Sequence, residues 1–446
     1  MSFGAAFLRG VLEQHLPAAA TGLAVSLSGG ADSACLLTAL KQLGARSVRG
    51  LPVRALHIDH ALQPLSSAFR AACAALCRDL DAPLTVITAA VRWEGVSIEA
   101  AARDARYRAL SRELKPGECL LTAHHAEDQA ETLLLQLLRG AGLKGLSAMP
   151  MCRTFGRGWH VRPLLEVARR ELRAFGEEHR IASLEDPMNY DPKFDRSFLR
   201  TQLWPQIEGR WRGAAAALSR TARHLAEAQE LLDQAAAVQV RRLRDGEALS
   251  VAGLRCLPEL EQLNTLRHWL SCAAVTPPST ARLTEALRQV LSAGADRLPA
   301  IVWGPYALRR YRARLFVTPA AKLVVGAPRD WFLEPGACLE LGPGLGRLRW
   351  VEQKGGLDAS RLPDRLSVRQ RRGGEALRIG RGARTQSVQH LCQYRGVLPW
   401  MRDALPMVYA GEELIAVADL WQDARWCVPE GAPGFGCVWE DPPNLA

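Results

Sequence analysis

Two hydrophobic patterns alternate along the N-terminal third of the chain. Short apolar runs of strand length are separated by longer stretches in which apolar residues recur at helical spacing. These patterns predict strands at residues 23–27, 53–59, 84–88 and 119–122, and helices at residues 7–16, 34–43, 66–80, 98–114 and 127–139. Strands that alternate with helices form a parallel sheet covered on both faces, so we predict a doubly wound α/β fold.

The alternation stops beyond residue 145, where the sequence changes character twice. A long helical stretch runs from residue 213 to about 244, residues 246–320 are mixed, and glycine, tryptophan and short β-like runs prevail from residue 339 onward. A chain of 446 residues suits two or three domains. The predicted domains are an N-terminal α/β domain at residues 1–212, a mainly helical middle domain at 213–320 and a small α+β or β-rich domain at 321–446.

A glycine turn directly after the first predicted strand has the composition of a phosphate-binding loop. Gly29 and Gly30 let the backbone approach a ligand closely, and the hydroxyls of Ser28 and Ser33 suit phosphate oxygens. Backbone N–H groups and the dipole of the following helix converge on the same point, which forms an anion site. Asp32 would repel a bare phosphate, so its presence indicates a divalent cation between the two.

The turn differs from the commonest phosphate loop. It lacks the lysine of the G-x-x-x-x-G-K-S/T motif, which argues against γ-phosphate transfer of that type. The alternative is an ordinary glycine-rich turn in which Asp32 or Ser33 caps the helix. The neighbouring motifs favour a functional site.

Polar clusters also lie at the ends of the second and fourth predicted strands, at the edge where parallel sheets bind their ligands. They consist of His57 and Asp59 in the last residues of the second strand and of His124, His125, Asp128 and Glu131 after the fourth. The first pair offers polar groups to a nucleotide base, or only caps the strand end. In the second cluster the two carboxylates share one face of the first helical turns, where they suit a metal ion or proton transfer, or complement the helix dipole.

Positive charge is concentrated in arginine. The chain holds 57 Lys and Arg, of which only six are Lys, against 46 Asp and Glu, and its net charge is +11. Arginine favours bidentate contact with phosphate, so a polyanionic partner is expected; a coding bias toward arginine would give the same composition. Arg103 and Arg106 share a helix face, and residues 361–402 hold ten arginines, among them Arg371 and Arg372. Both groups are either solvated surface or sites for triphosphate or RNA.

Eleven cysteines are scattered without a C-x-x-C pair, which favours buried reduced thiols over a disulfide framework. No apolar run is long enough to span a membrane, and the N-terminus lacks the pattern of a signal peptide. We therefore expect a cytoplasmic protein without a membrane partner.

Taken together, these motifs resemble the tRNA(Ile)-lysidine synthetases of the PP-loop (N-type) ATP pyrophosphatase superfamily, in their long three-domain form. The matching stretches, in the order of the family, are residues 28–33, 57–62, 99–103, 123–132, 138–146, 162–165, 185–189 and 196–200, with 371–375 and 398–402 near the C-terminus. The loop alone indicates only the superfamily, whereas the ordered set is much more specific. Three residues depart from the family pattern, because Gln63, Phe194 and Ser197 stand where Arg, Tyr and Asn are usual.

The resemblance implies a PP-loop, Rossmann-like catalytic domain that uses ATP and Mg²⁺. In the implied reaction, ATP adenylates the C2 carbonyl of the wobble cytidine of a tRNA(Ile) with a CAU anticodon and releases pyrophosphate. The ε-amine of free L-lysine then displaces AMP, which forms lysidine and converts the tRNA from methionine to isoleucine specificity. Recognition of the tRNA would fall to the middle domain and the arginine-rich C-terminal domain.

The residues and the resemblance together define the candidate site. The catalytic candidates are Asp32, Asp128 and Glu131, of which Asp32 and Asp128 are the expected metal ligands. Asp128 alternatively holds the cytosine, and Glu131 attracts the lysine ammonium or accepts its proton. The nucleotide-binding candidates are Ser28, Gly29, Gly30, Ala31, Asp32, Ser33, His57 and Asp59. The tRNA-contacting candidates are Arg103, Arg106, His124, His125, Arg139, Arg196, Arg200, Arg371 and Arg372.

Two alternatives remain open on the sequence. Another PP-loop tRNA-modifying enzyme, such as a 2-thiolase, would need a cysteine pair, and a glutamine-dependent synthetase would need a glutaminase cysteine that the sequence does not offer. An RNA-binding protein with an inactive nucleotide domain would not need Asp32, Asp128 and Glu131 intact. The sequence also leaves a homodimer open.

Overall fold

The computed structural model describes residues 3–44, 48–59, 66–89, 98–184, 193–294, 297–380 and 382–443. It divides into two compact units, Met1–Leu232 and Asp233–Ala446. The predicted domain limits at residues 212 and 320 stay predictions. Parts of the family resemblance lie outside the described residues, namely residues 60–62 with Gln63, the side chain of Glu99 and the stretch 185–189.

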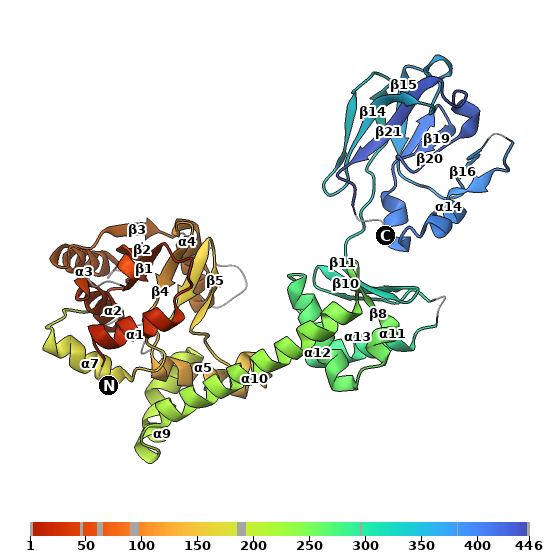
Figure 1. Ribbon diagram of the computed structural model, residues 1–446. Coiled ribbons are helices and arrows are strands. Elements are labelled where there is room, and N and C mark those ends of the chain that lie inside the picture. Colours follow the sequence, from red (N-terminus) through yellow and green to blue (C-terminus); the bar gives the residue numbers. More distant parts are fainter. Residues whose placement is uncertain are drawn as a thin grey trace. The chain divides into compact units, whose positions relative to one another are not determined.

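The first unit is built on a six-stranded sheet in the order β3-β2-β1-β4-β6-β5 (Figure 1). Its strands are β1 (Gly22–Ser26), β2 (Val53–Asp59), β3 (Leu84–Thr88), β4 (Glu118–Leu121), β5 (Cys152–Phe155) and β6 (Gly158–Val161). All neighbours pair in parallel except β5, which forms an antiparallel hairpin with β6. The parallel sheet is as predicted, whereas the hairpin is an addition, because two strands of four residues leave no clear period.

Helices pack on both faces of this sheet. The helices of the first unit are α1 (Ala5–His15), α2 (Ala31–Lys41), α3 (Ser66–Asp79), α4 (Ile98–Glu113), α5 (Ala126–Leu138), α6 (Leu143–Leu146), α7 (Arg169–Glu178), α8 (Asp195–Phe198) and α9 (Trp204–Arg210), with short turns at Val48–Gly50 and Leu199–Leu203, and α10 (Ala214–Leu243) continues from the first unit into the second. Successive strand residues point to opposite faces, so Leu23 and Val25 pack with α1, α2, α3 and α7, while Ala24 packs with Leu110 of α4 and with Leu114, which follows it. Burying each such leucine contributes about 1.5–3 kcal/mol. The predicted doubly wound fold is confirmed.

The second unit contains two separate hydrophobic cores. The first lies between helices and a five-stranded antiparallel sheet in the order β7-β8-β11-β10-β9, and includes Trp269 and Leu308. Its elements are β7 (Arg244–Asp245), β8 (Ala248–Ser250), α11 (Val251–Arg255), α12 (Glu259–Cys272), α13 (Thr280–Ser292), β9 (Ala300–Trp303), β10 (Tyr306–Tyr311) and β11 (Arg314–Pro319). The helices are those expected of a mainly helical middle domain. The sequence pattern predicts strands here only at residues 300–303 and 314–317, so the sheet is larger than predicted.

The second core belongs to the β-rich C-terminal part. Its sheets have the orders β12-β15-β18-β19-β20, β13-β14-β21 and β16-β17, and Trp331 stacks on Trp350 in the core with ring centroids 4.0 Å apart. The elements are β12 (Arg329–Phe332), β13 (Cys338–Gly342), β14 (Gly346–Lys354), β15 (Arg365–Arg369), β16 (Ala376–Leu377), β17 (Gln386–Ser387), α14 (Val388–Arg395), β18 (Met407–Ala410), β19 (Glu413–Val417), β20 (Trp421–Gln422) and β21 (Pro433–Glu440), with short turns at Ala359–Arg361, Pro399–Ala404 and Ala424–Trp426. The predicted β-rich character is confirmed.

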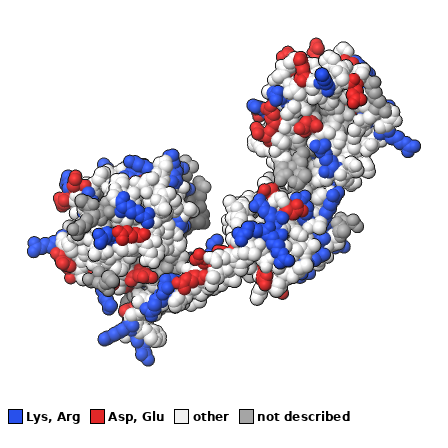
Figure 2. Space-filling model, in the orientation of Figure 1, with Lys and Arg blue, Asp and Glu red and all other residues white. Residues whose placement is uncertain are grey.

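Surface charge differs along the molecule. On the face shown in Figure 2, Lys and Arg side chains project around α9 and over the middle part of the second unit, whereas positive and negative side chains interleave over the C-terminal part. Residues 403–446, which follow the arginine-rich stretch, hold eight acidic residues and one arginine. Arg369 of the arginine-rich stretch, for example, pairs with Glu412 of this acidic segment at 3.0 Å. The acids that follow residue 402 therefore neutralise part of the basic stretch before it.

The buried cysteines are packed as protonated thiols, whereas Cys256, Cys272 and Cys338 are exposed. All eleven are free, and burial raises the pKa of Cys35, Cys73 and Cys119 to about 12. Thiols of this kind are unreactive at neutral pH. None of the described helices is long and apolar enough to cross a membrane.

Candidate active site

The glycine turn joins β1 to α2 and is held together by its two serines. The Ser33 hydroxyl accepts a hydrogen bond from the Ser28 N–H at 3.1 Å and donates one to the Gly30 carbonyl oxygen at 3.0 Å. The Ser28 hydroxyl lies 3.1 Å from the Ser33 hydroxyl and accepts from the Gly30 N–H at 3.3 Å. The serines predicted to contact phosphate therefore also fix the shape of the loop.

The geometry of the turn requires glycine at position 29. The φ of Gly29 is +89°, and a Cβ atom there would lie 2.8 Å from Cδ1 of Phe69. Gly30 has extended backbone, at φ −83° and ψ 162°, and is the N-cap of α2 without a side-chain cap hydrogen bond. Because no side chain caps this helix start, the N–H groups of its first turn are left for an anion, as such a site requires.

His57 contacts the end of β1. Its Nδ1 lies 2.9 Å from the Leu27 carbonyl oxygen and 3.4 Å from Sγ of Cys73, and its side chain is buried. These contacts fix the residue before the glycine turn, which is the role of a strand-end cap. Asp59 is half-buried at the end of β2, on the same sheet edge. The nucleotide contacts expected of both residues stay predictions.

His125 links the glycine turn to helix α5, because β1 and β4 are neighbours in the sheet. It is the N-cap of α5, and its Nε2 lies 3.7 Å from Oδ2 of Asp32 and 3.5 Å from Oδ2 of Asp128. Its Nδ1 lies 3.0 Å from Oε2 of Glu127. Burial disfavours the charged ring, but the carboxylates of Asp128, Glu127 and Asp32 outweigh burial and raise the pKa of His125.

Asp32 and Asp128 face the same histidine from two elements. The side chain of Asp32 is 34% exposed and that of Asp128 is 13% exposed. Burial raises the pKa of Asp32; the charge of His125 opposes this rise and the charge of Asp128 adds to it. A cation between the carboxylates would relieve their repulsion, so the pair fits Mg²⁺, which uses one or two carboxylates together with phosphate and water oxygens. The described residues contain no group of three or more His, Cys, Asp or Glu side chains placed to hold a metal ion by themselves.

Two arginines bind the carboxylates of α5. Arg196 contacts Oδ1 of Asp128 at 3.0 Å and Oε2 of Glu131 at 2.9 Å, and Arg200 contacts the same two residues at 2.9 and 2.8 Å. Burial would raise the pKa of Asp128, but the charges of His125, Arg196 and Arg200 outweigh it and lower the pKa strongly. Both arginines remain 25% exposed. The structure therefore places them beside the glycine turn, and their contacts with tRNA stay predictions.

Of the other arginines predicted in the first unit, Arg139 is exposed, whereas Arg103 and Arg106 are half-buried. Arg103 and Arg106 of α4 stack on the ring of Tyr107, with the guanidinium carbons 5.1 and 5.6 Å from its centroid. Arg139 follows α5 and pairs with Asp195 of α8 at 3.3 Å, with both side chains exposed. A weakly held, exposed arginine can exchange its partner for phosphate at little cost.

A buried chain of hydrogen bonds runs along the ends of β4 and β6. Oγ1 of Thr122 lies 2.8 Å from Nδ1 of His124 and 2.9 Å from Nε2 of His160, and Arg162 donates to Nδ1 of His160 at 3.1 Å. Burial lowers the pKa of His124 to about 3 and that of His160 to about 2, and Arg162 adds to both effects. Only His124 is among the predicted site residues. Thr122 and Arg162 could have been identified in the sequence by their position, because each directly follows a strand that ends at this edge of the sheet.

Arg371 and Arg372 belong to the second unit and differ from each other. Arg371 is 13% exposed, and its Nε lies 3.7 Å from Oε2 of Glu375, whereas the side chain of Arg372 is exposed. A phosphate can therefore reach Arg372 more easily than Arg371. The contacts with tRNA expected of both arginines stay predictions.

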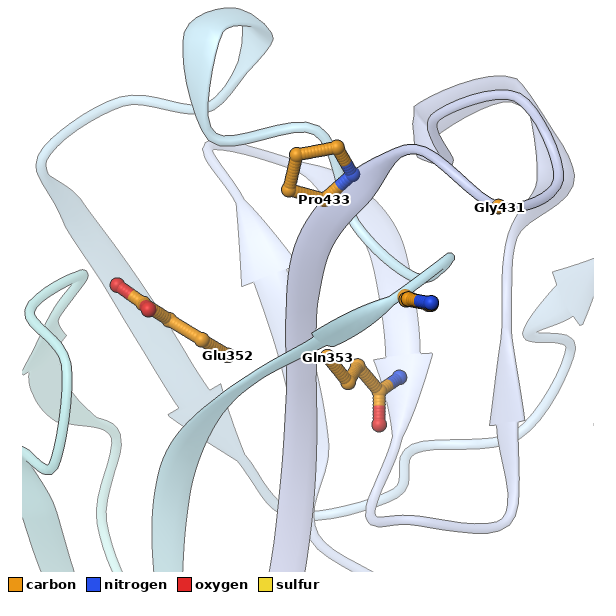
Figure 3. Close-up of a pocket in the computed structure, with 5 residues that line it drawn as sticks. Glu352, Gln353, Gly431 and Pro433 are labelled. Atoms are coloured by element: carbon orange, nitrogen blue, oxygen red, sulfur yellow. The ribbon is translucent and has the colours of Figure 1, made fainter.

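A hollow of 330 Å³ in the second unit is lined by Glu352, Gln353, Lys354, Gly431 and Pro433. Figure 3 draws these residues. None of the predicted site residues lines it. As neighbours in β14, Glu352 and Gln353 point to opposite sides of the strand (Figure 3). The hollow therefore lacks the convergent polar groups that mark a ligand site.

Three family models match the chain in succession. They are a PP-loop domain at residues 7–207, a TilS substrate binding domain at residues 249–316 and a TilS substrate C-terminal domain at residues 366–439. Among solved structures, the U34-tRNA thiolase NcsA from Methanococcus maripaludis with its 4Fe-4S cluster covers 49% of this chain and 78% of its own. Its TM-score of 0.40 and 15% identity are too low to bear on function.

Relatives named tRNA(Ile)-lysidine synthase are similar to the chain from end to end. The one from Alkalilimnicola ehrlichii is 39% identical over 431 residues, which cover 95% of this chain and 94% of the relative. The one from Pseudomonas aeruginosa is 40% identical over 439 residues, which cover 93% of this chain and 96% of the relative. Together with the matches to the three family models, these similarities show that the chain belongs to the tRNA(Ile)-lysidine synthase family.

Proposed function

We propose that this chain attaches L-lysine to C2 of the wobble cytidine of a tRNA(Ile) with a CAU anticodon, using ATP for activation. The observation that carries the proposal is the meeting of the glycine turn, Asp32 and Asp128 at one sheet edge in a member of this family. Because His125 contacts both carboxylates, a nucleotide held by the turn would have its phosphates beside both of them.

The first step is adenylation of the cytidine. The C2 carbonyl oxygen attacks the α-phosphorus of ATP, a new phosphorus–oxygen bond forms, and the bond to pyrophosphate breaks. The N–H groups of the turn and of the start of α2 then meet the charge that develops on the leaving pyrophosphate. Gly29 and Gly30 allow that approach, and Ser28 and Ser33 keep the turn in place.

Asp32 and Asp128 would hold Mg²⁺ in this scheme. The cation supplies positive charge that neutralises the phosphate oxygens and the leaving pyrophosphate. His125 orients both carboxylates, and Arg196 and Arg200 fix Asp128 from the other side.

The second step is attack by lysine. The ε-nitrogen forms a bond to C2, the bond between C2 and the AMP oxygen breaks, and the nitrogen loses a proton. Glu131 is the candidate to draw the ammonium group and to accept the proton. Asp128 is a poor proton acceptor, because the neighbouring positive charges lower its pKa strongly.

The tRNA would contact both units. In the first unit, the exposed Arg139 and the half-buried Arg103 and Arg106 offer guanidinium groups to RNA phosphates. In the second unit, Arg372 is the exposed member of the arginine pair. Phosphate contacts of this kind position an RNA, while contacts to splayed anticodon bases specify it.

Incubation of the purified protein with ATP, labelled L-lysine and tRNA(Ile) tests the proposal. Incorporation of label into the tRNA and release of AMP that depend on all three substrates support it. Binding of tRNA without AMP formation would instead identify an RNA-binding protein. The tRNA for methionine with the same anticodon serves as the control RNA and is expected to accept little label.

A further inference from the structure

We propose that His124 is a fixed hydrogen-bond donor to the reacting groups, and that Thr122, His160 and Arg162 are positioning residues that set its tautomer. The identity of the acceptor rests on the proposed function. The tautomer rests on the hydrogen bonds of the described residues alone.

Arg162 sets the direction of the chain of hydrogen bonds, because a guanidinium group has donors and no acceptor. Its Nη2 donates to Nδ1 of His160 at 3.1 Å, and its Nη1 donates to the Pro150 carbonyl oxygen at 2.8 Å. Arg162 is only 3% exposed, so the group cannot turn toward water instead. Nδ1 of His160 must therefore be an acceptor without a hydrogen.

His160 is therefore the hydrogen-bond donor to Thr122. A neutral imidazole with a bare Nδ1 carries its hydrogen on Nε2, which lies 2.9 Å from Oγ1 of Thr122 and donates to it. The ring is fully buried beside the rings of Tyr107 and Phe155, at centroid distances of 5.7 and 5.6 Å. Water therefore does not replace the threonine as its partner.

Thr122 is in turn the hydrogen-bond donor to His124. Its hydroxyl accepts from His160 and has one hydrogen to donate, and Nδ1 of His124 lies 2.8 Å away. Thr122 is 7% exposed, and a buried hydroxyl hydrogen without an acceptor would cost about 1–3 kcal/mol. The hydroxyl therefore donates to Nδ1 of His124, which leaves the hydrogen of His124 on Nε2.

The half-buried His124 ring thus presents an N–H donor at the end of β4, near the start of α5. An N–H donor in this place binds a hydrogen-bond acceptor. The acceptor oxygens of the groups that react in the adenylation step are those of the α-phosphate and of the C2 carbonyl. A preorganised donor to such an oxygen is typically worth about 10²–10³ in rate.

The first test reads the tautomer directly. Long-range ¹H–¹⁵N spectra of the full-length protein with ¹⁵N-labelled histidine report which ring nitrogen carries hydrogen, and the His124→Gln variant identifies the signal. We expect the Nε2–H form in the native protein, a mixture of tautomers in Thr122→Val, and return of the Nε2–H form in Thr122→Ser. Thr38→Val is the control, because Thr38 is also 7% exposed and its hydroxyl has no partner. An Nδ1–H or charged His124 ring in the native protein would overturn the proposal.

The second test separates the two acceptor oxygens. We expect His124→Ala to lower the rate of AMP formation by about 100-fold or more, and His124→Gln, which keeps an N–H donor, to stay within about tenfold of the native rate. Weaker ATP binding by His124→Ala in the absence of tRNA identifies the phosphate oxygen; unchanged ATP binding with slower AMP formation identifies the carbonyl.

Equal rates in the Ala and Gln variants would contradict a donor role. Failure of the native protein to form lysidine would refute the proposed function but leave the tautomer measurement valid. The two failures are therefore distinguishable.

Discussion

Arg200 binds Glu131 through two parallel hydrogen bonds, from Nε to Oε1 at 2.8 Å and from Nη2 to Oε2 at 2.8 Å. Glu131 is 1% exposed, so removal of Arg200 would leave a buried carboxylate with Arg196 as its remaining cation. Breaking a buried pair costs about 3–5 kcal/mol when no other partner remains. Because Arg196 remains, we expect Arg200→Ala to lower the free energy of unfolding by about 2–3 kcal/mol, measured by urea denaturation.

Arg139 provides the matched control for this variant. It pairs with Asp195, but the two side chains are 61% and 74% exposed. Exposed pairs contribute about 0–1 kcal/mol, so Arg139→Ala is expected to change the free energy of unfolding by less than about 1 kcal/mol. A loss in Arg139→Ala as large as that in Arg200→Ala would contradict the importance of burial.

The two glycines of the turn are expected to differ in their tolerance of alanine. Gly29 has a φ of +89°, and its Cβ would lie 2.8 Å from Phe69, whereas the nearest atom to a Cβ at Gly30 is 3.5 Å away. We expect Gly29→Ala to lower the free energy of unfolding by about 1–3 kcal/mol and to weaken ATP binding at least tenfold. Gly30→Ala is the control, with a stability change below about 1 kcal/mol. Equal effects of the two variants would show that backbone strain does not determine how well each position tolerates alanine.

The sequence predicts the sheet better than it predicts the site. β2 and β3 lie at the predicted residues, because Val53–Asp59 and Leu84–Thr88 are short segments with several apolar or β-branched residues, and each directly follows a proline. The hydrophobic period identifies such strands without knowledge of their partners. The short β5–β6 hairpin depends on its pairing with β4, which no local pattern reports.

The site was predictable only where its residues follow a strand end directly. Asp32 and Asp128 come from turns after neighbouring parallel strands, so topology brings them to His125. Arg196 and Arg200, by contrast, reach the carboxylates from more than sixty positions away in sequence, and their partners cannot be read from helical spacing. Arginine in a sequence suggests phosphate, but here it first compensates the charge of buried carboxylates.

The neutral histidines should make the protein sensitive to acid. The pKa of His160 is lowered to about 2 and that of His124 to about 3, chiefly by burial. In the unfolded chain both rings bind a proton below about pH 6.5, whereas the folded protein does not, so the free energy of unfolding falls as pH drops below that value. The expected slope is about 1.4 kcal/mol per pH unit for each histidine. His125 adds nothing there, since its raised pKa keeps it charged in both states.

Urea denaturation at several pH values between about 6.0 and 5.0, below the ordinary pKa of histidine, measures this slope. Replacement of His160 by glutamine removes one of the two groups, so the slope of His160→Gln should be about half that of the native protein in this range. An unchanged slope would mean that His160 binds a proton in the folded state.

Asp32 is expected to serve chemistry and not RNA binding. Its carboxylate faces His125 and lies in the first turn of α2, at the phosphate loop. We expect Asp32→Ala to abolish AMP formation while the Kd for tRNA stays within a few-fold of the native value. Asp195→Ala, which removes an exposed carboxylate of the same unit, is the control for general effects. Loss of tRNA binding with retained AMP formation would contradict the assignment.

Variants of Arg371 and Arg372 in the second unit are expected to distinguish the loss of a phosphate contact from a loss of stability. Arg372 is exposed, whereas Arg371 is 13% exposed beside Glu375, which is itself 7% exposed. We expect Arg372→Glu to weaken tRNA binding and to reduce the slope of log K against log salt by about 1, since one phosphate contact is lost, with stability unchanged. Arg371→Glu should lower the free energy of unfolding instead, because it places two carboxylates together in a poorly solvated position. Filter binding at several salt concentrations, with urea denaturation of each variant, measures both effects. An unchanged salt slope in Arg372→Glu would mean that this surface does not contact the tRNA.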